Sequence, residues 1–280
     1  MTTPSMPPNE PSNPNQPSDQ PPDQPSDQLS APTAPSPRDV AYWARPVGRL
    51  HVSALPAGAS GLNVDGRRVV GPLQGFGQMW QKTYRVGLVG AKVTPVEVIK
   101  TWKEQFPKFW PEGNRFYEPL TGIAPGEVAA LKLKVGGAVP LSTGVLVLYA
   151  DDESFTLMTP QGHVFAGWIT FSGHVKGECT LAQAQLLIRA NDPLFELGMR
   201  LGGSREEDRF WTHTLAAVAA HFGVQEPVQR QVVCIDPRLQ WSQVGNIWQN
   251  AAIRTTIHTM TAPIRRIRHW GERSQHRERS

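Results

Sequence analysis

Thr94-Pro95-Val96-Glu97 and Ser204-Arg205-Glu206-Glu207 carry the same pattern, and the segment between them decides the fold. In each, a hydroxyl residue is followed three residues later by Glu, so each side chain can accept a hydrogen bond from the other residue's backbone N–H. Pro95 adds to the first signal, because its missing N–H costs nothing at the first helical position. The pattern predicts that a helix begins at each site.

Around these helix starts, apolar and polar residues alternate and are divided by tight turns, which is typical of strands. We expect strands over 79–88, 127–135, 143–149, 155–159, 163–172 and 178–189. The first precedes the first helix and the others follow it. Because their connections are short, the consecutive strands must pair antiparallel.

The helices should each present one apolar face. The first helix should end or kink near Phe106, because Pro107 follows. Asp192-Pro193 predicts a short helix that Gly202-Gly203 ends, and the second helix-start pattern then opens a long helix over about 205–222. The apolar face of the long helix carries Trp211, Leu215, Val218 and Phe222.

The order strand, helix, antiparallel strands, short segment and long C-terminal helix, over roughly 76–223, resembles the START-like (SRPBCC) helix-grip domains. These domains include polyketide cyclases, plant pathogenesis-related proteins and lipid-transfer domains. The turn Thr159-Pro160-Gln161-Gly162-His163, followed by Gly167, also resembles the GTLPGH…G segment of a bacterial START-like family of unknown function. That local match transfers no chemistry.

The resemblance implies an α+β fold in which a curved antiparallel sheet of about six to seven strands wraps around a long C-terminal helix. It also implies a deep apolar cavity between sheet and helix. Most members bind hydrophobic small molecules there, and some catalyse cyclisation or hydration with a few polar groups in the cavity.

We expect four regions along the chain. We expect residues 1–37 to be a disordered Pro/Ser/Asp/Gln-rich tail, because this segment has a four-residue repeat and no aromatic residue and is too polar to bury a core. It is either a solvating tail or a PxxP-type docking ligand. Residues 38–75 form an irregular arm, 76–224 the helix-grip domain, and 225–280 a C-terminal extension with an amphipathic helix and a basic end.

Charge is uneven within a net charge of +4. Residues 1–37 hold four acids before the first base, and 254–280 hold seven Arg against Glu272 and Glu278. The near-neutral middle argues against a nucleic-acid-binding core. Cys179 and Cys234 are too few and too far apart for a disulfide framework or a thiolate zinc site. We expect a cytoplasmic protein, since we find neither a signal-peptide pattern nor a membrane-length apolar run.

Aromatic residues of the elements that would border the cavity are the predicted ligand-binding set. They are Trp80, Trp102, Phe106, Tyr149, Phe155, Trp168 and Trp211. Large apolar faces with a polar handle suit ligand pockets; the alternative is that these side chains fill the core. No catalytic residue, cofactor or metal ligand is predicted.

Two polar groups of residues have competing interpretations. His163 and His174, near the ends of one predicted strand, are either acid/base groups or turn residues bonded to backbone or water. The charge-dense stretch 192–209 is either a polar cluster at the cavity mouth or a set of helix caps and solvated ion pairs. Arg189 and Glu196 are the pair whose burial would distinguish these.

The C-terminal region has helical apolar spacing through Trp241, Val244, Trp248 and Ala251 and then becomes basic. Three interpretations remain: a helix docked on the domain, contact with an anionic membrane through Arg265, Arg266 and Arg268, or contact with nucleic-acid phosphates, which is the least favoured.

Three functions follow. The first is a module that binds a hydrophobic small molecule or lipid. The second is a cyclase- or hydratase-type enzyme that uses the same cavity, and the third is an adaptor that works through the tails. The sequence does not identify the ligand or the oligomeric state.

Overall fold

The computed structural model describes residues 40–52, 55–135 and 139–261. The core of the fold is one antiparallel sheet whose strand order is β2-β3-β4-β5-β6-β7-β1-β8. The strands are β1 (Met79–Gly87), β2 (Arg115–Tyr117), β3 (Val128–Val135), β4 (Val139–Ala150), β5 (Ser154–Met158), β6 (Phe165–Lys176), β7 (Cys179–Ala190) and β8 (Gln229–Asp236). Strands β3 to β7 are joined by short turns, which confirms the expected antiparallel run.

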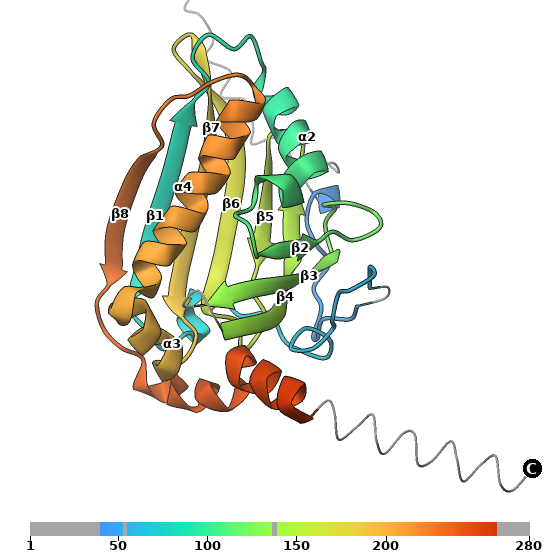
Figure 1. The fold of residues 1–280 in the computed structure, drawn as a ribbon, viewed down its shortest axis with the longest axis vertical. Coiled ribbons are helices and arrows are strands. Elements are labelled where there is room, and N and C mark those ends of the chain that lie inside the picture. Colours follow the sequence, from blue (N-terminus) through green and yellow to red (C-terminus); the bar gives the residue numbers. More distant parts are fainter. Residues whose placement is uncertain (1–39, 53–54, 136–138, 262–280) are drawn as a thin grey trace, which may run out of the picture. The chain divides into compact units, whose positions relative to one another are not determined.

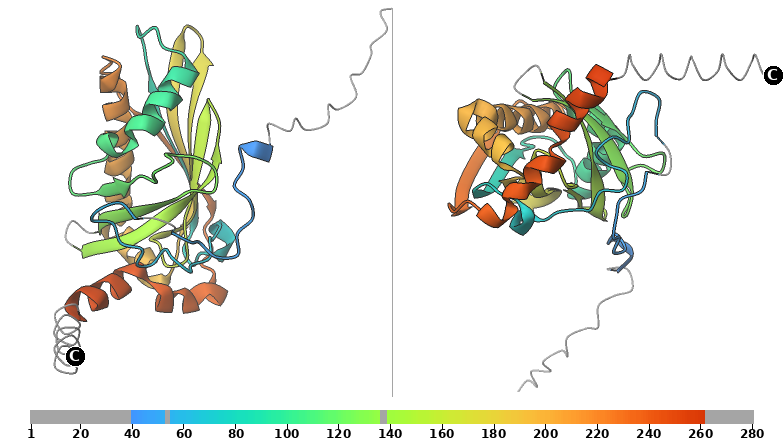
Figure 2. Two further views of the ribbon diagram at one scale, coloured as in Figure 1. Left: turned by 90° about the vertical axis from the view of Figure 1, so that its right-hand side faces the viewer. Right: turned by 90° about the horizontal axis from the view of Figure 1, so that it is seen from below.

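The expected α+β architecture is confirmed. The sheet curves, and α4 (Ser204–His221) lies across its concave side, where the orange helix crosses β1, β7 and β6 in Figure 1. Helix α2 (Pro95–Gln105) packs against β6 and β7 toward the other end of the sheet (Figure 2). This is the helix-grip arrangement, with a sheet of eight strands among the described residues rather than six or seven.

The two additional strands escaped the sequence-based prediction for physical reasons. Strand β2 has three residues, too few to show a period. Strand β8 pairs with β1 at the edge of the sheet and is exposed along nearly its whole length, so its sequence carries no alternation between core and solvent.

The first helix-start pattern is a capping box, as predicted. Thr94 Oγ1 accepts a hydrogen bond from the Glu97 N–H at 3.2 Å, and Glu97 Oε2 accepts one from the Thr94 N–H at 2.8 Å. Helix α2 ends at Gln105, and the short helix η2 (Phe106–Phe109) follows, as expected from Pro107.

The second helix-start prediction is wrong in its caps, although a long helix does occur there. Ser204 lies inside the helix with helical dihedrals, and neither Gly203 nor any side chain caps it. The preceding turns, α3 (Pro193–Gly198) and η3 (Met199–Gly203), run directly into α4 with a kink at Gly202, whose φ is +130°. Ser204 and Glu207 are therefore not needed as caps and take part in a buried ion cluster, described below.

An aromatic cluster fills the end of the concave side beneath α2. Phe106 lies edge-on to Phe116, Phe155 and Phe171 at ring-centroid distances of 4.8 to 5.4 Å, and Trp102 adds a further edge contact to Phe171 at 5.1 Å. Such edge-to-face pairs stabilise a core beyond the area they bury. This cluster closes one end of the space between sheet and helices.

Two buried helix caps attach the C-terminal region to the domain. Asp192 caps α3 by accepting hydrogen bonds from the N–H groups of Leu194 and Phe195, and its other oxygen accepts one from Asn250 Nδ2 at 2.8 Å. Asn250 in turn caps the helix over 251–261 through Ala252 and Ile253. Burial raises the pKa of Asp192. The C-terminal segment is thus two pieces, η4 (Trp241–Gln249) and the helix over 251–261, divided at Asn250.

The helix over 251–261 is docked on the domain. Ala251 and Thr255 are buried, and Asn63 donates from Nδ2 to the Ala251 carbonyl and to Thr255 Oγ1, both at 3.2 Å. The basic residues Arg265, Arg266 and Arg268 lie outside the described residues.

Gly162 should be essential for this docking. Its φ is +85°, and a Cβ there would clash with the Gln249 carbonyl oxygen, while its own carbonyl accepts the Ala251 N–H at 2.9 Å. Gly162→Ala should lower the free energy of unfolding by at least about 2 kcal/mol more than Gly90→Ala, measured by chemical denaturation. Gly90 is the matched control, because its φ of +81° is similar but a Cβ added there would meet no atom within 4 Å. Equal losses would contradict the prediction.

Candidate functional site

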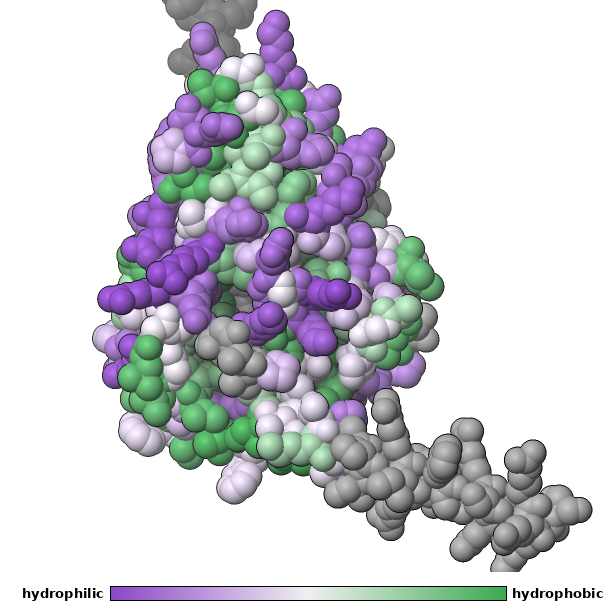
Figure 3. All heavy atoms as spheres, viewed as in Figure 1, coloured by the Kyte–Doolittle hydropathy of each residue, from purple (hydrophilic) through white to green (hydrophobic). Residues whose placement is uncertain are grey.

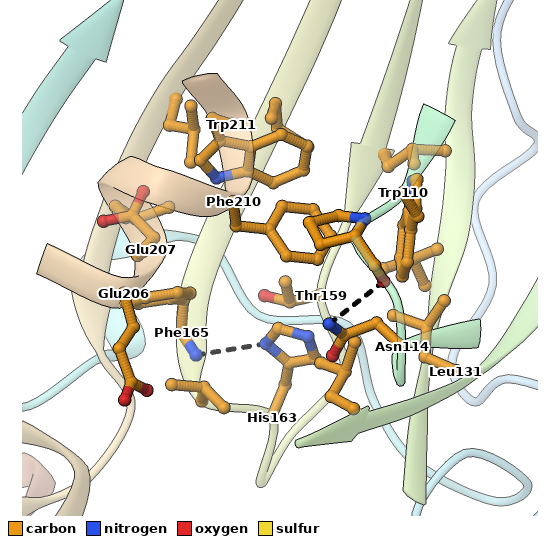
Figure 4. Close-up of a pocket in the computed structure, with 18 of the residues that line it drawn as sticks. Trp110, Asn114, Leu131, Thr159, His163, Phe165, Glu206, Glu207, Phe210 and Trp211 are labelled. Atoms are coloured by element: carbon orange, nitrogen blue, oxygen red, sulfur yellow. Dashed lines mark hydrogen bonds between the residues drawn. The ribbon is translucent and has the colours of Figure 1, made fainter. Parts of the chain in front are cut away.

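A cavity of about 630 Å³ lies between the first turns of α4 and the concave side of the sheet, and it opens to solvent. Its walls come from α4, from the turn over 110–114 and from strands β3 to β7 (Figure 4). The volume falls in the range of about 300–1,000 Å³ that small-molecule sites occupy.

The cavity wall is mainly apolar. Trp110, Phe210 and Trp211 form an aromatic surface on the α4 side, with Trp110 and Phe210 edge-on at 5.0 Å and Phe210 and Trp211 at 4.8 Å. The sheet supplies mainly aliphatic side chains, together with Phe116, Phe165 and Trp168. The aliphatic ones are Leu131, Leu133, Val145, Leu157, Ile169, Leu186 and Ile188. Polar side chains border the cavity where it meets solvent, among them Glu112, Lys134, Glu206 and Arg209, and hydrophilic residues gather around the middle of this face (Figure 3).

His163 lies on the cavity floor and is only 7% exposed. Its Nδ1 accepts a hydrogen bond from the Phe165 N–H at 3.1 Å, so Nδ1 carries no proton and the neutral ring holds its proton on Nε2. Burial lowers the pKa of His163 to about 4, so the ring is neutral at physiological pH. In Figure 4 the second ring nitrogen points into the cavity, where it presents an N–H donor.

The turn from Thr159 to His163 and the residue Gly167 form one hydrogen-bonded unit. Thr159 Oγ1 both donates to the Gly167 carbonyl and accepts from the Gly167 N–H, each at 3.1 Å. Gly167 has no room for a side chain, since a Cβ would clash with the Leu187 carbonyl oxygen. Thr159 and Gly167 therefore hold the turn together, Gly162 contacts the C-terminal segment, and His163 is directed into the cavity.

A buried ion cluster joins α4 to β1 behind the cavity wall. The Lys82 ammonium, on a side chain only 4% exposed, contacts Glu207, Asp208 at 3.0 Å and Ser204 at 3.1 Å. Tyr84 donates to Asp208 at 2.6 Å, and Arg230 on β8 pairs with the other oxygen of Asp208. Lys82 also lines a second hollow of about 210 Å³ on the β8 side of α4, so the cluster stands between the two hollows.

The two carboxylates of this cluster differ in acidity. Burial raises the pKa of Glu207 to about 7 against the lowering effect of Lys82. For Asp208, burial also acts to raise the pKa, but the hydrogen bonds from Tyr84 and Lys82 outweigh it and the pKa is lowered. Glu207 is thus the carboxyl group of the cavity wall that titrates near neutrality.

The predicted aromatic set is divided among four places. Trp168 and Trp211 line the cavity. Trp102, Phe106 and Phe155 lie in the buried aromatic cluster and do not line it. Trp80 lines the second hollow, and Tyr149 contacts Tyr42 and Trp43 in the N-terminal arm.

The structure also gives the positions and partners of the charged candidates. Arg189 and Glu196 are both buried but do not pair: Arg189 bonds to Asp236 at 2.5 Å and to the Gly77 carbonyl, whereas Glu196 pairs with Arg200. His174 is exposed on β6 and lies apart from the cavity. Within the stretch 192–209, helix capping explains Asp192, but Glu207 and Asp208 belong to the buried ion cluster.

Sequence-based reasoning missed Lys82 and Glu207 as site residues, although their pattern contained a signal. Lys82 lies two residues after Trp80 and two before Tyr84, so all three side chains point to the same side of β1. Glu207 and Asp208 precede Trp211 by four and three residues, which places them on its face of the helix. A lysine on a buried strand face and two acids on the facing helix predict a pair.

No group of three or more His, Cys, Asp and Glu side chains in the described part of the chain is arranged to hold a metal ion. Of the helices in residues 40–52, 55–135 and 139–261, none is long and apolar enough to cross a membrane.

Comparisons with known proteins give a likeness of fold. No family model matches the sequence, and no curated protein matches it. Similar solved structures include the di-domain ARO/CYC StfQ from the steffimycin biosynthetic pathway, which is 10% identical with a TM-score of 0.41 over 51% of this chain and 50% of that one. A START superfamily protein from Mycobacterium smegmatis is 21% identical with a TM-score of 0.36, over 52% of this chain and 98% of its own.

A third similar structure is the major latex-like protein 151 from Panax ginseng, 16% identical with a TM-score of 0.34 over 52% of this chain and 99% of its own. The match to StfQ spans half the length of that di-domain protein. These neighbours include START-type proteins, the superfamily that the order of elements resembles, but the likeness is too distant to transfer an activity.

The low pKa of His163 predicts a pH-dependent stability. Because its pKa is depressed from 6.5 to about 4 in the folded protein, its contribution to stability is present above pH 6.5 and is lost as the pH falls towards 4. His163→Asn keeps an acceptor for the Phe165 N–H and removes the titration. Relative to this variant, the wild-type free energy of unfolding should fall by roughly 3 kcal/mol over that window. Denaturant unfolding at several pH values measures this difference. If the free energies of unfolding of the wild type and of His163→Asn change with pH in parallel, the prediction is refuted.

Proposed function

We propose that this protein binds a hydrophobic small molecule in the cavity between α4 and the sheet. The observation that carries the proposal is an open cavity of about 630 Å³ whose wall is mostly aromatic and aliphatic. Burying apolar ligand surface there is favourable by roughly 25 cal/mol per Å². The aromatic surface of Trp110, Phe210 and Trp211 suits a flat or ring-containing ligand.

An enzyme that uses the same cavity is the alternative from the sequence. Two groups in the wall that could move protons are Glu207, with its pKa of about 7, and the neutral His163. A ligand recovered chemically unchanged after incubation with the protein supports binding, and a transformed one supports an enzyme.

Filling the cavity should weaken ligand binding. Leu133 and Lys132 are neighbours on β3, and only Leu133 lines the cavity, since alternate residues of a strand face opposite sides. Leu133→Trp should weaken binding of the fluorescent probe 8-anilinonaphthalene-1-sulfonate by about tenfold or more, because the new side chain occupies its space. Lys132→Trp, the matched control, should bind like the wild type. Wild-type protein that fails to bind both this probe and co-purifying hydrophobic molecules would refute the proposed function.

We also propose that the end of the molecule carrying η4 and α3 contacts an anionic membrane surface. Trp241 is 68% and Trp248 85% exposed, and apolar residues gather over these elements at the lower end of Figure 3. Exposed apolar residues of the neighbouring elements are Leu194, Leu197, Leu201, Ile257 and Met260. Exposed Trp with neighbouring basic residues favours the interface of anionic lipid.

Charge supports this choice of partner. The chain continues beyond Thr261 into a sequence with six Arg and two Glu, and Arg238 and Arg254 near the apolar surface are exposed. Lipid bound at this surface would lie at the same end of the domain as the first turns of α4, which border the cavity (Figure 1).

Replacing both exposed Trp residues should reduce membrane binding. Trp241→Ser with Trp248→Ser should lower the partition onto phosphatidylserine-containing vesicles by about tenfold or more, measured by co-sedimentation, since two large apolar groups are lost. Trp43→Ser, at an exposed Trp in the N-terminal arm, is the control and should leave partition unchanged. Equal binding to vesicles without phosphatidylserine would contradict the membrane proposal. Self-association of the protein through the exposed apolar surface of η4 and α3 would also contradict it.

A further inference from the structure

We propose that His163 donates a hydrogen bond from Nε2 to a carbonyl oxygen of the ligand, so that the cavity selects hydrophobic molecules that carry a ketone or similar acceptor at the end that enters first. This inference rests on the proposed function, because it requires a ligand in the cavity. It adds a chemical class and an orientation to that ligand.

The first step is that the Nε2–H group has no partner among the described residues. The Phe165 N–H occupies Nδ1, and no hydrogen bond joins Nε2 to any described group. The ring is more than nine-tenths buried and its free nitrogen points into the cavity (Figure 4). A ligand that enters the cavity shields this donor from water, so a ligand acceptor there avoids the cost of a buried unpaired donor, which a purely apolar ligand would incur.

The second step is that neighbouring polar groups do not compete for this donor. Thr159, which lies beside His163 in Figure 4, uses its hydroxyl on both backbone groups of Gly167. The Asn114 side chain is bonded to the backbone at both ends: its Oδ1 accepts from the Lys134 N–H at 3.0 Å, and its Nδ2 donates to the Pro111 carbonyl at 3.4 Å. Other lining residues on this side of the cavity, such as Val164 and Leu157, are apolar. A ligand carbonyl is therefore the acceptor that the floor lacks.

The third step is that His163 remains a donor with a fixed tautomer across the neutral range. The turn that carries it is held on both sides, by Gly162 against Gln249 and by Thr159 against Gly167. The donor therefore needs no reorganisation when the ligand arrives, and such preorganisation favours affinity.

A pair of rigid probes of equal shape tests the inference: 9-fluorenone carries a carbonyl where fluorene carries a methylene group. The ratio of the two dissociation constants is measured for the wild type, for His163→Asn and for His174→Asn, the same change at an exposed histidine. His163→Asn should reduce the preference for fluorenone by about three- to tenfold, and His174→Asn should leave it unchanged.

The carbonyl stretching frequency of bound fluorenone provides a direct readout. A hydrogen bond to the carbonyl should lower this frequency in the wild type relative to the His163→Asn complex, which a merely structural role of His163 would not do.

The outcomes separate the two proposals. If the wild type binds neither probe nor any co-purifying hydrophobic molecule, the proposed function fails. If it binds both probes and the ratio is insensitive to His163→Asn, the inference fails while the proposed function stands. If His163→Asn does not fold, an unshifted carbonyl frequency in the wild-type complex overturns the inference by itself.

Discussion

The buried contact between Lys82 and the acids Glu207 and Asp208 is the constraint on which the arrangement of sheet and helix depends. Removing one partner from a buried ion pair leaves an uncompensated charge and costs about 3–5 kcal/mol, so α4 must place both acids over β1. The helix is thereby fixed in rotation and in position along its axis. Since Trp211 follows Glu207 by one helical turn, the same contact brings the Trp211 and Phe210 rings to the cavity.

The cavity is a consequence of how side-chain size is distributed over the concave face. Under α2 the rings of Trp102, Phe106, Phe155 and Phe171 meet and exclude space. Opposite the first turns of α4, the strands carry mainly Leu, Ile and Val, and an open space remains there between sheet and helix. The kinked entry into α4 at Gly202 then borders a mainly apolar space whose wall includes His163 and Glu207.

Much of the fold could be predicted because its elements carry strong local signals. Strands β3 to β7 alternate in sequence and are divided by turn residues, and Thr94 and Glu97 form the capping box that their spacing indicates. The same spacing at Ser204 and Glu207 was misleading. A nearby lysine on β1 competes for these side chains, and its position opposite them depends on contacts far apart in the chain.

The antiparallel strand run, the long helix with Trp211 on its inward face and the turn that carries His163 can all be read from the sequence, because they follow from local periodicity and turn chemistry. Four features required the folded structure: which aromatic residues border open space, the contact of Lys82 with Glu207, the extension of the sheet by β8, and the N–H that His163 directs into the cavity. The physical reason is that burial, pairing and pKa depend on neighbours supplied by distant segments, and a residue type does not specify those neighbours.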